Sequence, residues 1–230
     1  MITDINKLKQ LAAAAAVDAV QSGMIVGLGS GSTATFMIQE IGERLRDGRL
    51  RDIVGLPTSE KTAQQARSLA IPLATLEEQP AIDLVIDGAD EIDPKLDLIK
   101  GLGGSLLREK IIASVSKRMI VISDHRKLVD RLGTRAPLPV EVIPFARQPV
   151  ENFLRSLGSK PVIRQKEGQI FITDEGNIIL DCYFEEIADP VQLGQIIIAQ
   201  PGIVEHGFFL GMATEAVVAT ETGIERYSRE

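Results

Sequence analysis

The 230-residue sequence has one cysteine, two histidines, no tryptophan and only 4% aromatic residues. The single cysteine, Cys182, excludes a disulfide within the chain, and this usage fits a reducing, cytoplasmic compartment. Cys182 lies in an apolar segment typical of a strand, so we expect it to be a core residue. The histidines, His125 and His206, lie far apart in the sequence, and we therefore expect no zinc or iron site.

Long hydrophobic runs and an excess of basic residues are also absent. No apolar stretch approaches the roughly 20 residues of a membrane span, and residues 1–4 lack the basic region of a signal peptide. The 32 acidic and 25 basic residues give a net charge of −7, which argues against general nucleic-acid binding. We therefore expect neither a membrane nor a nucleic acid as a partner, while local donors still allow an acidic protein to bind a phosphate.

A glycine-rich segment near the N-terminus has the pattern of an anion-binding loop. Its sequence is Ile25-Val26-Gly27-Leu28-Gly29-Ser30-Gly31-Ser32-Thr33-Ala34-Thr35. An apolar run, alternating glycines and then a helical apolar pattern predict a strand, a tight turn and a helix N-terminus. Main-chain N–H groups and the helix dipole attract an anion there, and the hydroxyls of Ser30, Ser32 and Thr33 suit a phosphate. The alternative is an ordinary helix cap beside a flexible turn.

The same loop lacks the signatures of two nucleotide-binding loops. A P-loop needs Gly-Lys-Ser/Thr, whereas Gly31 is followed directly by Ser32. The dinucleotide fingerprint fails when counted from Gly27. Counted from Gly29 it has a tolerated Ala34 in the sixth position, but no acidic residue follows a second strand at about 20 residues. A single phosphate fits the loop better than a nucleotide.

Two further glycine-containing segments concentrate acids and bases. They are Asp87-Gly88-Ala89-Asp90-Glu91-Ile92-Asp93 and Lys100-Gly101-Leu102-Gly103-Gly104-Ser105-Leu106-Leu107-Arg108-Glu109-Lys110. Glu109 lies in what we predict to be the first turn of a helix. Together the segments favour proton-transfer chemistry on a small anionic molecule, and the alternative is two surface loops with solvated charges. The acidic run lacks the spacing of a calcium loop.

Strand-like and helix-like segments alternate over the first half of the chain. We predict strands at 24–28, 53–56, 71–73, 84–86 and 119–123, and helices at 5–21, 32–46, 59–69 and 109–116. This alternation predicts a doubly wound, mostly parallel α/β sheet, with a ligand site at the carboxyl ends of its strands.

From about residue 131 the pattern changes to that of a smaller α+β unit. We predict one short strand between Pro137 and Pro144, strands at 162–165, 169–173, 177–183 and 203–206, and helices at 149–157 and 190–199. A hairpin turn at 174–176 joins two of these strands.

The three glycine-containing segments resemble those of ribose-5-phosphate isomerase, type A. The stretches Val54-Gly55-Leu56-Pro57-Thr58-Ser59 and Pro137-Leu138-Pro139-Val140-Glu141-Val142-Ile143-Pro144 agree as well, and the likeness runs from about residue 8 to about residue 220. The resemblance implies a Rossmann-like catalytic domain of residues 1–132 and 207–230, with a ferredoxin-like domain of residues 133–206 inserted into it.

The resemblance also implies a reaction. It is the reversible isomerisation of D-ribose 5-phosphate to D-ribulose 5-phosphate through a cis-enediolate, in the non-oxidative pentose phosphate pathway and without a metal or other cofactor. Glu109 matches the proton-shuttling base, a role that suits a carboxylate whose pKa is raised by partial burial. The alternative for Glu109 is a first-turn carboxylate that complements the helix dipole.

Three further side chains match catalytic positions of the family. Asp87 and Asp90 match carboxylates that hold substrate hydroxyls and help to open the furanose ring, although either could instead close an Asx turn. Lys100 matches a cation near the sugar oxygens, where charge builds as the proton leaves. Lys100 could contact the phosphate instead.

The substrate-binding set implied by the resemblance is larger. It comprises Ser30, Gly31, Ser32, Thr33, Asp87, Gly88, Ala89, Asp90, Lys100, Gly101, Leu102, Gly103 and Lys127. Lys127 could instead be an exposed loop lysine, and Lys9 either reaches the phosphate or is solvated. We expect Glu91 and Asp93 to be structural or solvated, and His125 to be a surface-loop residue.

The sequence departs from the family pattern at three of these positions. Ser30 replaces a common Thr and keeps the hydroxyl. Leu102 interrupts a glycine triplet, which would cost on the order of 1 kcal/mol or more if that position needed positive φ. Arg108 replaces a common Thr and would add positive charge beside Glu109, which would lower the pKa of Glu109.

Other functions compete with the isomerase. A sugar-phosphate-sensing domain of a transcription regulator would need an appended helix-turn-helix, and only about four residues precede the first predicted helix. A coenzyme A transferase would use a glutamate nucleophile, and an amino-sugar phosphate deaminase would use a histidine near the acids. Neither histidine lies in the three motif segments, and we expect an isomerase that forms a homodimer or homotetramer.

Overall fold

The computed structural model describes residue 2 and residues 4–229. The chain divides into two compact units. Unit 1 consists of Met1–Ala89, Arg108–Lys127 and Gly211–Glu230, and unit 2 consists of Asp90–Leu107 and Leu128–Leu210. Within the described residues, no helix has both the length and the apolar character that crossing a membrane requires.

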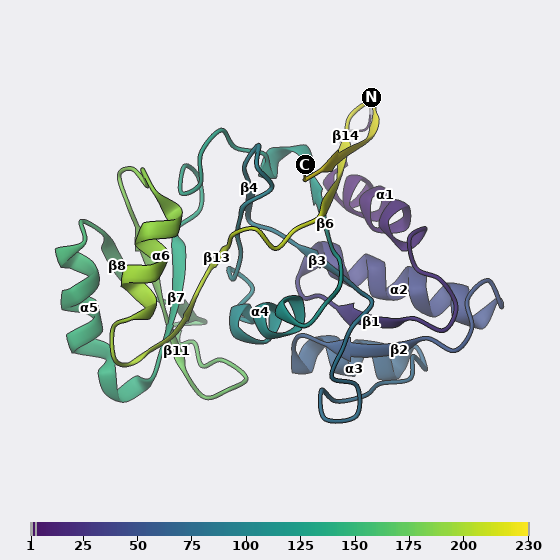
Figure 1. Cartoon of the computed structure of the whole chain (residues 1–230), viewed down its shortest axis with the longest axis horizontal. Helices are drawn as coiled ribbons and strands as arrows, with labels where there is room; N and C mark the ends of the chain where they lie inside the picture. The colour runs from purple at the N-terminus through teal and green to yellow at the C-terminus, as the bar shows by residue number, and fades with distance from the viewer. Residues whose placement is uncertain (1, 3, 230) are drawn as a thin grey trace. The chain divides into compact units, whose positions relative to one another are not determined.

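Unit 1 is built on a six-stranded sheet with the strand order β15-β14-β6-β3-β1-β2 (Figure 1). Five neighbouring strands are parallel, and β15 pairs antiparallel with β14 at the edge. The strands are β1 (Ile25–Leu28), β2 (Val54–Pro57), β3 (Leu84–Gly88), β6 (Met119–Asp124), β14 (Glu215–Thr220) and β15 (Gly223–Ser228). This confirms the predicted mostly parallel α/β sheet.

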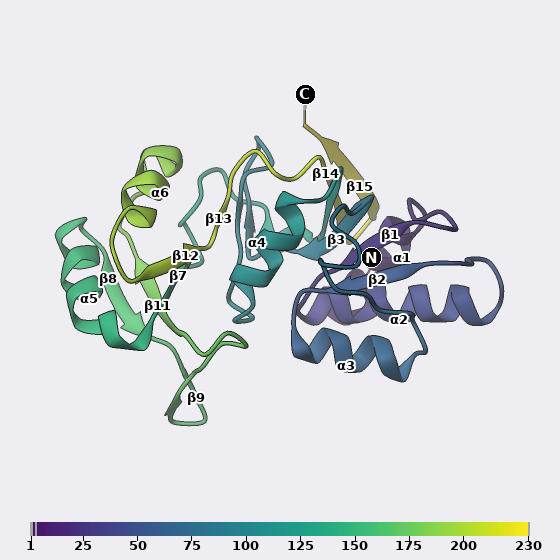
Figure 2. The same ribbon diagram turned by 60° about the horizontal axis from the view of Figure 1, so that its bottom comes forward.

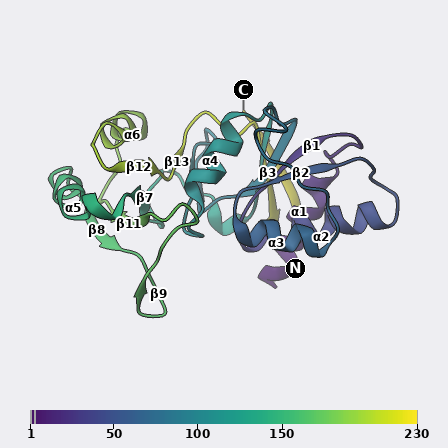
Figure 3. The ribbon, with the colours of Figure 1, turned by 90° about the horizontal axis from the view of Figure 1, so that it is seen from below.

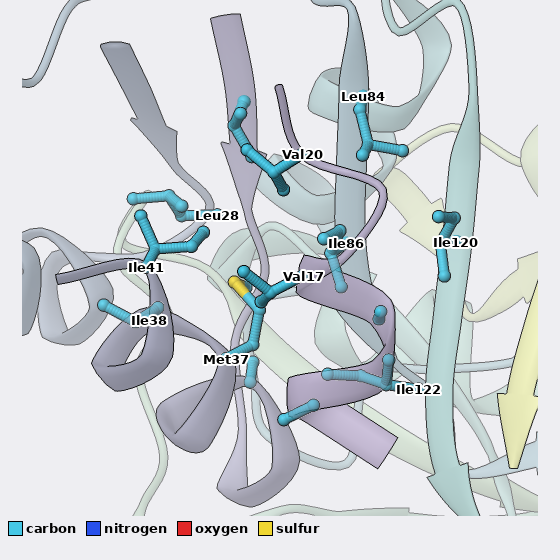
Figure 4. Packing of buried hydrophobic residues seen from close by; sticks show 14 of the residues in the cluster. Val17, Val20, Leu28, Met37, Ile38, Ile41, Leu84, Ile86, Ile120 and Ile122 are labelled. Atoms are coloured by element: carbon cyan, nitrogen blue, oxygen red, sulfur yellow. The ribbon is translucent and has the colours of Figure 1, made fainter. Parts of the chain in front are cut away.

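The main core of unit 1 lies between this sheet and helices α1 (Ile5–Val17) and α2 (Ser32–Arg46). Alternate residues of the strands, such as Leu84 and Ile86 of β3, point toward the two helices (Figure 4). The intervening residues of β3 face the other side of the sheet, where α4 (Leu106–Ser114) packs. A Cβ added at Gly27 of β1 would lie 2.7 Å from Ile112 of α4. Helix α3 (Glu60–Ser68) follows β2 and is capped by Ser59, whose side chain accepts a hydrogen bond from the N–H of Thr62.

Unit 2 contains a four-stranded antiparallel sheet with the order β12-β7-β11-β8. Its elements follow one another as β7 (Leu138–Val142), α5 (Arg147–Ser156), β8 (Lys160–Ile163), β11 (Ile178–Tyr183), α6 (Pro190–Ile198) and β12 (Ile203–His206). This β-α-β-β-α-β order is the predicted ferredoxin-like arrangement. Both helices pack on one face of the sheet (Figure 3), through residues such as Leu154 and Ile197.

A small hairpin projects from the four-stranded sheet (Figure 2). It is formed by β9 (Gln165–Lys166) and β10 (Gln169–Ile170), which pair antiparallel. The predicted strand 169–173 is therefore shorter than expected. Beyond β10 only one isolated bridge, Ile172 to Ile178, joins this segment to β11.

A second sheet of unit 2 has three short strands in the order β13-β5-β4. They are β4 (Glu91–Ile92), β5 (Leu98–Ile99) and β13 (Phe208–Phe209). Because β5 pairs with β13, residues 90–107 belong to unit 2. The chain therefore divides at 89/90 and 107/108, within the segment that the sequence analysis assigned wholly to the first domain.

Several element boundaries also differ from the predicted ones. Helix α1 ends at Val17 because the chain turns there, with Ala19 and Val20 bonding three residues back. Helix α4 begins at Leu106, three residues before the predicted start. The predicted strand 71–73 is a single bridge between Leu73 and Gly55. Two short 3-10 helices, η1 (His125–Lys127) and η2 (Pro144–Ala146), complete the fold.

Candidate active site

The glycine-rich segment after β1 forms the loop that leads into α2. Gly31 precedes the helix with a φ of 99°, and no side chain caps the helix start. The first-turn N–H groups of α2 therefore lie at the positive end of the helix dipole, as an anion site requires. Lys9 of α1 extends its Nζ to within 2.9 Å of Ser32 Oγ. The Lys9 Nζ thus lies beside the first residue of α2.

The hydroxyl of Ser30 belongs to a cluster of four. Its Oγ lies 2.8 Å from Thr58 Oγ1, 2.8 Å from Ser59 Oγ and 3.1 Å from Thr62 Oγ1. Thr58 and Thr62 donate their protons to the main-chain oxygens of Leu28 and Gly29, both at 3.0 Å. Because a carbonyl only accepts, these two protons are committed, and Ser30 donates into the cluster. The cluster attaches the segment of residues 29–33, named the anion loop below, to the start of α3.

Asp87 lies at the carboxyl end of β3 and is buried. Its Oδ1 accepts hydrogen bonds from the N–H groups of Ser30, at 3.0 Å, and Gly88, at 2.7 Å. The loop passes so close to this carboxylate that a Cβ on Gly29 would lie 2.3 Å from Oδ1. Gly29 is therefore required for close approach rather than for chain flexibility.

Glu109 lies in the first turn of α4 and is 4% exposed. A Cβ on Gly27 would lie close to both Ile112 of α4 and Val85 of β3, so Val85 is on the sheet face that α4 covers. Asp87, two residues later on β3, points to the same face. The neighbouring Arg108 forms an ion pair with Glu60 of α3, at 2.8 Å. This contact lowers the pKa of Glu60. The guanidinium that we expected beside Glu109 is thus held by a carboxylate of α3.

Lys127 is the last residue of η1, which directly follows β6. The preceding Asp124 is buried and accepts hydrogen bonds from the Arg126 side chain at 2.7 and 3.0 Å. Burial opposes ionisation of Asp124, but the bonds from Arg126 outweigh it and lower the pKa of Asp124. His125 lies in the same short helix and is half-buried.

In unit 2, Asp90 is joined to the second glycine-rich segment. Its Oδ2 accepts a hydrogen bond from the N–H of Leu102 at 2.9 Å, and the N–H of Gly104 bonds to the oxygen of Gly101 at 3.0 Å. Residues 101–104 thus form a tight turn, named the glycine turn below. Positive φ falls on Gly101, at 105°, and Gly104, at 89°, and Leu102 does not adopt it. Leucine at position 102 therefore causes no backbone strain, and its side chain is exposed.

Lys100, immediately before the glycine turn, is only 2% exposed. Its Nζ lies 5.3 Å from the ring centroid of Phe209 on β13. A cation over an aromatic face is stabilised electrostatically. The ring thus supports a buried positive charge at this position.

The other acids of the acidic run, Glu91 and Asp93, accept main-chain hydrogen bonds, which agrees with the structural one of the two alternatives (structural or solvated). The Glu91 carboxylate is fully buried and accepts hydrogen bonds from the main-chain N–H groups of Gly133, Arg135 and Ala136. Asp93 accepts from the N–H groups of Lys95 and Asp97, and burial raises its pKa.

The predicted site residues thus form two groups. Unit 1 carries the anion loop with Ser30, Gly31, Ser32 and Thr33, together with Asp87, Gly88, Ala89, Glu109 and Lys127, and unit 2 carries Asp90, Lys100, Gly101, Leu102 and Gly103. Among the described residues, no group of three or more His, Cys, Asp or Glu side chains is arranged to hold a metal ion.

Sequence analysis missed the side chains that support these groups. Thr58, Ser59 and Thr62 hold the anion loop, and Arg164 donates to main-chain oxygens of the glycine turn. The stretch that contains Thr58 and Ser59 was noted only for its resemblance. Nothing in the local sequence indicates Arg164, because its contact spans 63 positions.

Known proteins decide among the competing functions. The family model described as ribose 5-phosphate isomerase A (phosphoriboisomerase A) matches residues 54–223. Ribose-5-phosphate isomerase A of Roseiflexus castenholzii is 54% identical over 222 residues, which cover 96% of this chain and 95% of that protein. The chain belongs to the ribose-5-phosphate isomerase A family. It is therefore an isomerase that interconverts ribose 5-phosphate and ribulose 5-phosphate.

Solved structures of ribose-5-phosphate isomerases share the fold over nearly the whole chain. The isomerase of Plasmodium falciparum superposes with a TM-score of 0.96 at 40% identity, covering 98% of this chain and all of that one. A D-ribose-5-phosphate isomerase in complex with phospho-erythronic acid also superposes with a TM-score of 0.96, at 39% identity, covering 99% and 100% of the two chains.

Proposed function

We propose that Glu109 is the base that moves the proton between C2 and C1 of the sugar phosphate. The observation that carries this proposal is a buried carboxylate in the first turn of α4, on the sheet face toward which Asp87 points. A base in a water-poor position holds the proton it removes long enough to return it to the neighbouring carbon. The sequence motif that contains Glu109 supports the same assignment.

The proton balance of the reaction defines the other roles. Glu109 takes the proton from C2 of the open-chain aldose, and the C–H electron pair forms the C1–C2 double bond of an enediolate while O1 gains negative charge. Return of the proton to C1, with transfer of the O2 proton to O1, gives the ketose. Asp87 and Asp90 hold substrate hydroxyls, and one of them moves the O1 proton toward the ring oxygen to open the furanose.

Charge on the enediolate oxygens needs preorganised donors. In our proposal these are Lys100 and the main-chain N–H groups of Gly101 and Gly103, while the N–H of Leu102 donates to Asp90. The burial of Lys100 supports this role, because a charge in a water-poor environment interacts more strongly. Phospho-erythronic acid, which is bound in one related isomerase, carries both a phosphate and a carboxylate, and a carboxylate resembles the charge of an enediolate.

The phosphate binds at the start of α2 in this proposal. Gly31, Ser32 and Thr33 supply N–H groups and hydroxyls, and Lys9 and Lys127 supply positive charge. Gly88 and Ala89 contact the substrate beside Asp87. Ser30 donates its hydroxyl into the cluster with Thr58, Ser59 and Thr62, so its part is to orient the loop.

We further propose that the enzyme works without a metal or other cofactor, as a homodimer or homotetramer in the cytoplasm, and serves the non-oxidative pentose phosphate pathway. Its only cysteine is buried, which suits a reducing compartment.

The test compares wild type with Glu109→Gln in chelator-treated buffer, with ribose 5-phosphate as substrate. Removal of the base should lower kcat by at least about 100-fold, with thermal unfolding and phosphate binding unchanged. Glu43→Gln, near the C-terminal end of α2 and away from the anion loop, controls for the substitution of a carboxylate by an amide. Exchange of solvent deuterium into C1 should fall in parallel. Turnover that survives in Glu109→Gln would assign the base to another group, with Asp87 and Asp90 the next candidates.

A further inference from the structure

Arg164 and Asp181 form a side-chain pair in unit 2 that none of the roles above uses. Arg164 directly follows β8, and Asp181 lies on β11, where its neighbours Leu180 and Cys182 point into the helix-covered core. Asp181 therefore points to the opposite face of the sheet. Arg164 Nε donates to Asp181 Oδ2 at 2.9 Å and Nη2 donates to Oδ1. The two side chains are only 11% and 15% exposed.

The guanidinium still has donors for a second partner, and that partner is the glycine turn. Arg164 Nη1 donates to the main-chain oxygen of Gly101 at 2.6 Å and to that of Leu102 at 3.1 Å. The planar fork of arginine allows it to bind a carboxylate with one edge while it donates from another. Two consecutive peptide groups of the turn are thus oriented by one side chain.

Orienting these oxygens also orients the N–H groups of the same peptides. In a trans peptide the C=O and N–H bonds point in opposite directions, and no cis peptide occurs in the described residues. The N–H of Leu102 accordingly points away from Arg164 and donates to Asp90 Oδ2 at 2.9 Å. By the same geometry the N–H of Gly103 points away from Arg164. A Cβ at Gly103 would meet no atom within 4 Å outside its chain neighbours, so the side of Gly103 where a side chain would lie is open.

A second residue holds the same turn from the same hairpin. The N–H of Phe171 bonds to the oxygen of Arg164 at 3.0 Å, so the two residues close the base of the β9–β10 hairpin. The Phe171 ring packs against Gly104, where an added Cβ would lie 2.4 Å from Cζ. Three of the four residues of the glycine turn are glycines, which have the greatest conformational freedom. Contacts from outside the turn therefore decide its conformation.

We propose that Arg164, held by Asp181, is a positioning residue for the isomerisation. It orients the N–H groups of Leu102 and Gly103 and thereby places Asp90 and the donors for the enediolate oxygens. The inference rests on the proposed role of the glycine turn. It predicts that loss of Arg164 weakens binding of the enediolate more than binding of the phosphate, so kcat falls while KM changes little.

The decisive variant replaces both members of the pair, Arg164→Met with Asp181→Leu. Removing one partner alone would leave a buried charge, whereas removing both keeps the volume apolar. We expect kcat on ribose 5-phosphate to fall about 10- to 100-fold, a smaller loss than the roughly 100- to 1,000-fold typical of deleting a donor itself. Arg164→Lys keeps the charge but lacks the planar fork, and we expect a partial loss. If the double variant does not fold, Arg164→Lys carries the test.

Arg44 provides a matched control. It is 14% exposed and binds Glu40, Asp18 and the main-chain oxygen of Ala14, but it lies far along α2 from the anion loop. Arg44→Met should leave kcat unchanged even if it lowers thermal stability. Equal losses of kcat in Arg44→Met and the double variant would overturn the proposal.

Binding of two probes separates positioning from general damage. The affinity for phospho-erythronic acid should fall about 10-fold or more in the double variant, while the affinity for inorganic phosphate should not change. Wild-type kcat in the double variant, or equal losses for both probes, would overturn the role of Arg164. Such a result would leave the proposed role of Glu109 intact, because the Glu109→Gln variant tests that role separately. Conversely, full activity of Glu109→Gln would contradict the role of Glu109 without changing the kcat expected for the Arg164 variants.

Discussion

The main-chain N–H of Ser30 donates a hydrogen bond to Oδ1 of Asp87 at 3.0 Å. This bond joins the anion loop after β1 to the carboxylate at the end of β3, two neighbouring parallel strands. The Asp87 side chain thus orders the main chain of the loop, and Asp87 is also one of the catalytic residues that we propose. The two alternatives for Asp87, a substrate contact and a backbone contact, are compatible because a carboxylate has two oxygens.

The hydroxyl cluster should matter for phosphate binding more than for proton transfer. We expect Thr62→Val to raise KM several-fold while kcat changes little, because the Ser30 segment loses one of its attachments. Each lost hydrogen bond should lower the free energy of unfolding by about 1 kcal/mol. Steady-state kinetics and thermal unfolding measure the two effects.

Ser159→Ala is the control for this cluster. The Ser159 hydroxyl is also buried and also donates to a main-chain oxygen, that of Leu154, but it lies in unit 2. It should lower stability by a similar amount without changing KM. A KM for Thr62→Val equal to that of wild type would show that the cluster supports the fold alone.

Lys100→Gln distinguishes the two contacts that sequence analysis left open for this lysine. If Lys100 stabilises the enediolate, kcat should fall by about 100-fold or more with a small change in KM. If it contacts the phosphate, KM should rise and the affinity for inorganic phosphate should fall. Lys117→Gln, at an exposed ion pair with Asp83, controls for the loss of one positive charge. We expect the first outcome, because Lys100 lies beside the glycine turn.

Glu141 in unit 2 should make stability depend on pH. Burial raises the pKa of Glu141, and the charges of Glu175 and Glu205 add to this, while hydrogen bonds from Asn177 and Thr173 oppose it. A carboxyl with a raised folded-state pKa is most favourable to folding when protonated. Its contribution is therefore fully present below the usual value of 4.5 and is lost as the pH rises through the folded-state pKa.

Glu141→Gln tests this dependence, because an amide keeps an oxygen for Thr173 and Asn177 without a charge. We expect the variant to unfold at a higher temperature than wild type near neutral pH, with a smaller difference near pH 4. Thermal unfolding of both proteins across this range measures the effect. A variant that is less stable than wild type at neutral pH would contradict it and would indicate that the charged form is the better partner.

Cys182 should be unreactive in the folded protein. It has no exposed surface, and burial raises the pKa of its thiol to about 12. Since the thiolate is the reactive form, a thiol reagent at neutral pH should label the native chain very slowly and the denatured chain completely. Rapid labelling of one thiol under native conditions would show that β11 opens readily.

Some features of this protein follow from local sequence. The alternation of apolar strands and amphipathic helices determined the parallel sheet of unit 1, and the helix at 32–46 was predicted at its observed limits. The anion loop could be predicted because a strand, a run of glycines and a helix start all lie within about a dozen consecutive residues. Local hydrogen bonding and side-chain periodicity suffice for such elements.

Other features were decided only by tertiary structure. Residues 90–107 belong to unit 2 because β5 pairs with β13, more than 100 positions later in the chain. Thr62 and Arg164 acquire their partners from segments 32 and 63 positions away. No local pattern encodes these contacts, because the register of distant strands brings the side chains together. The sequence therefore determined which chemical groups the site contains, and the packing of distant segments determined how they are held.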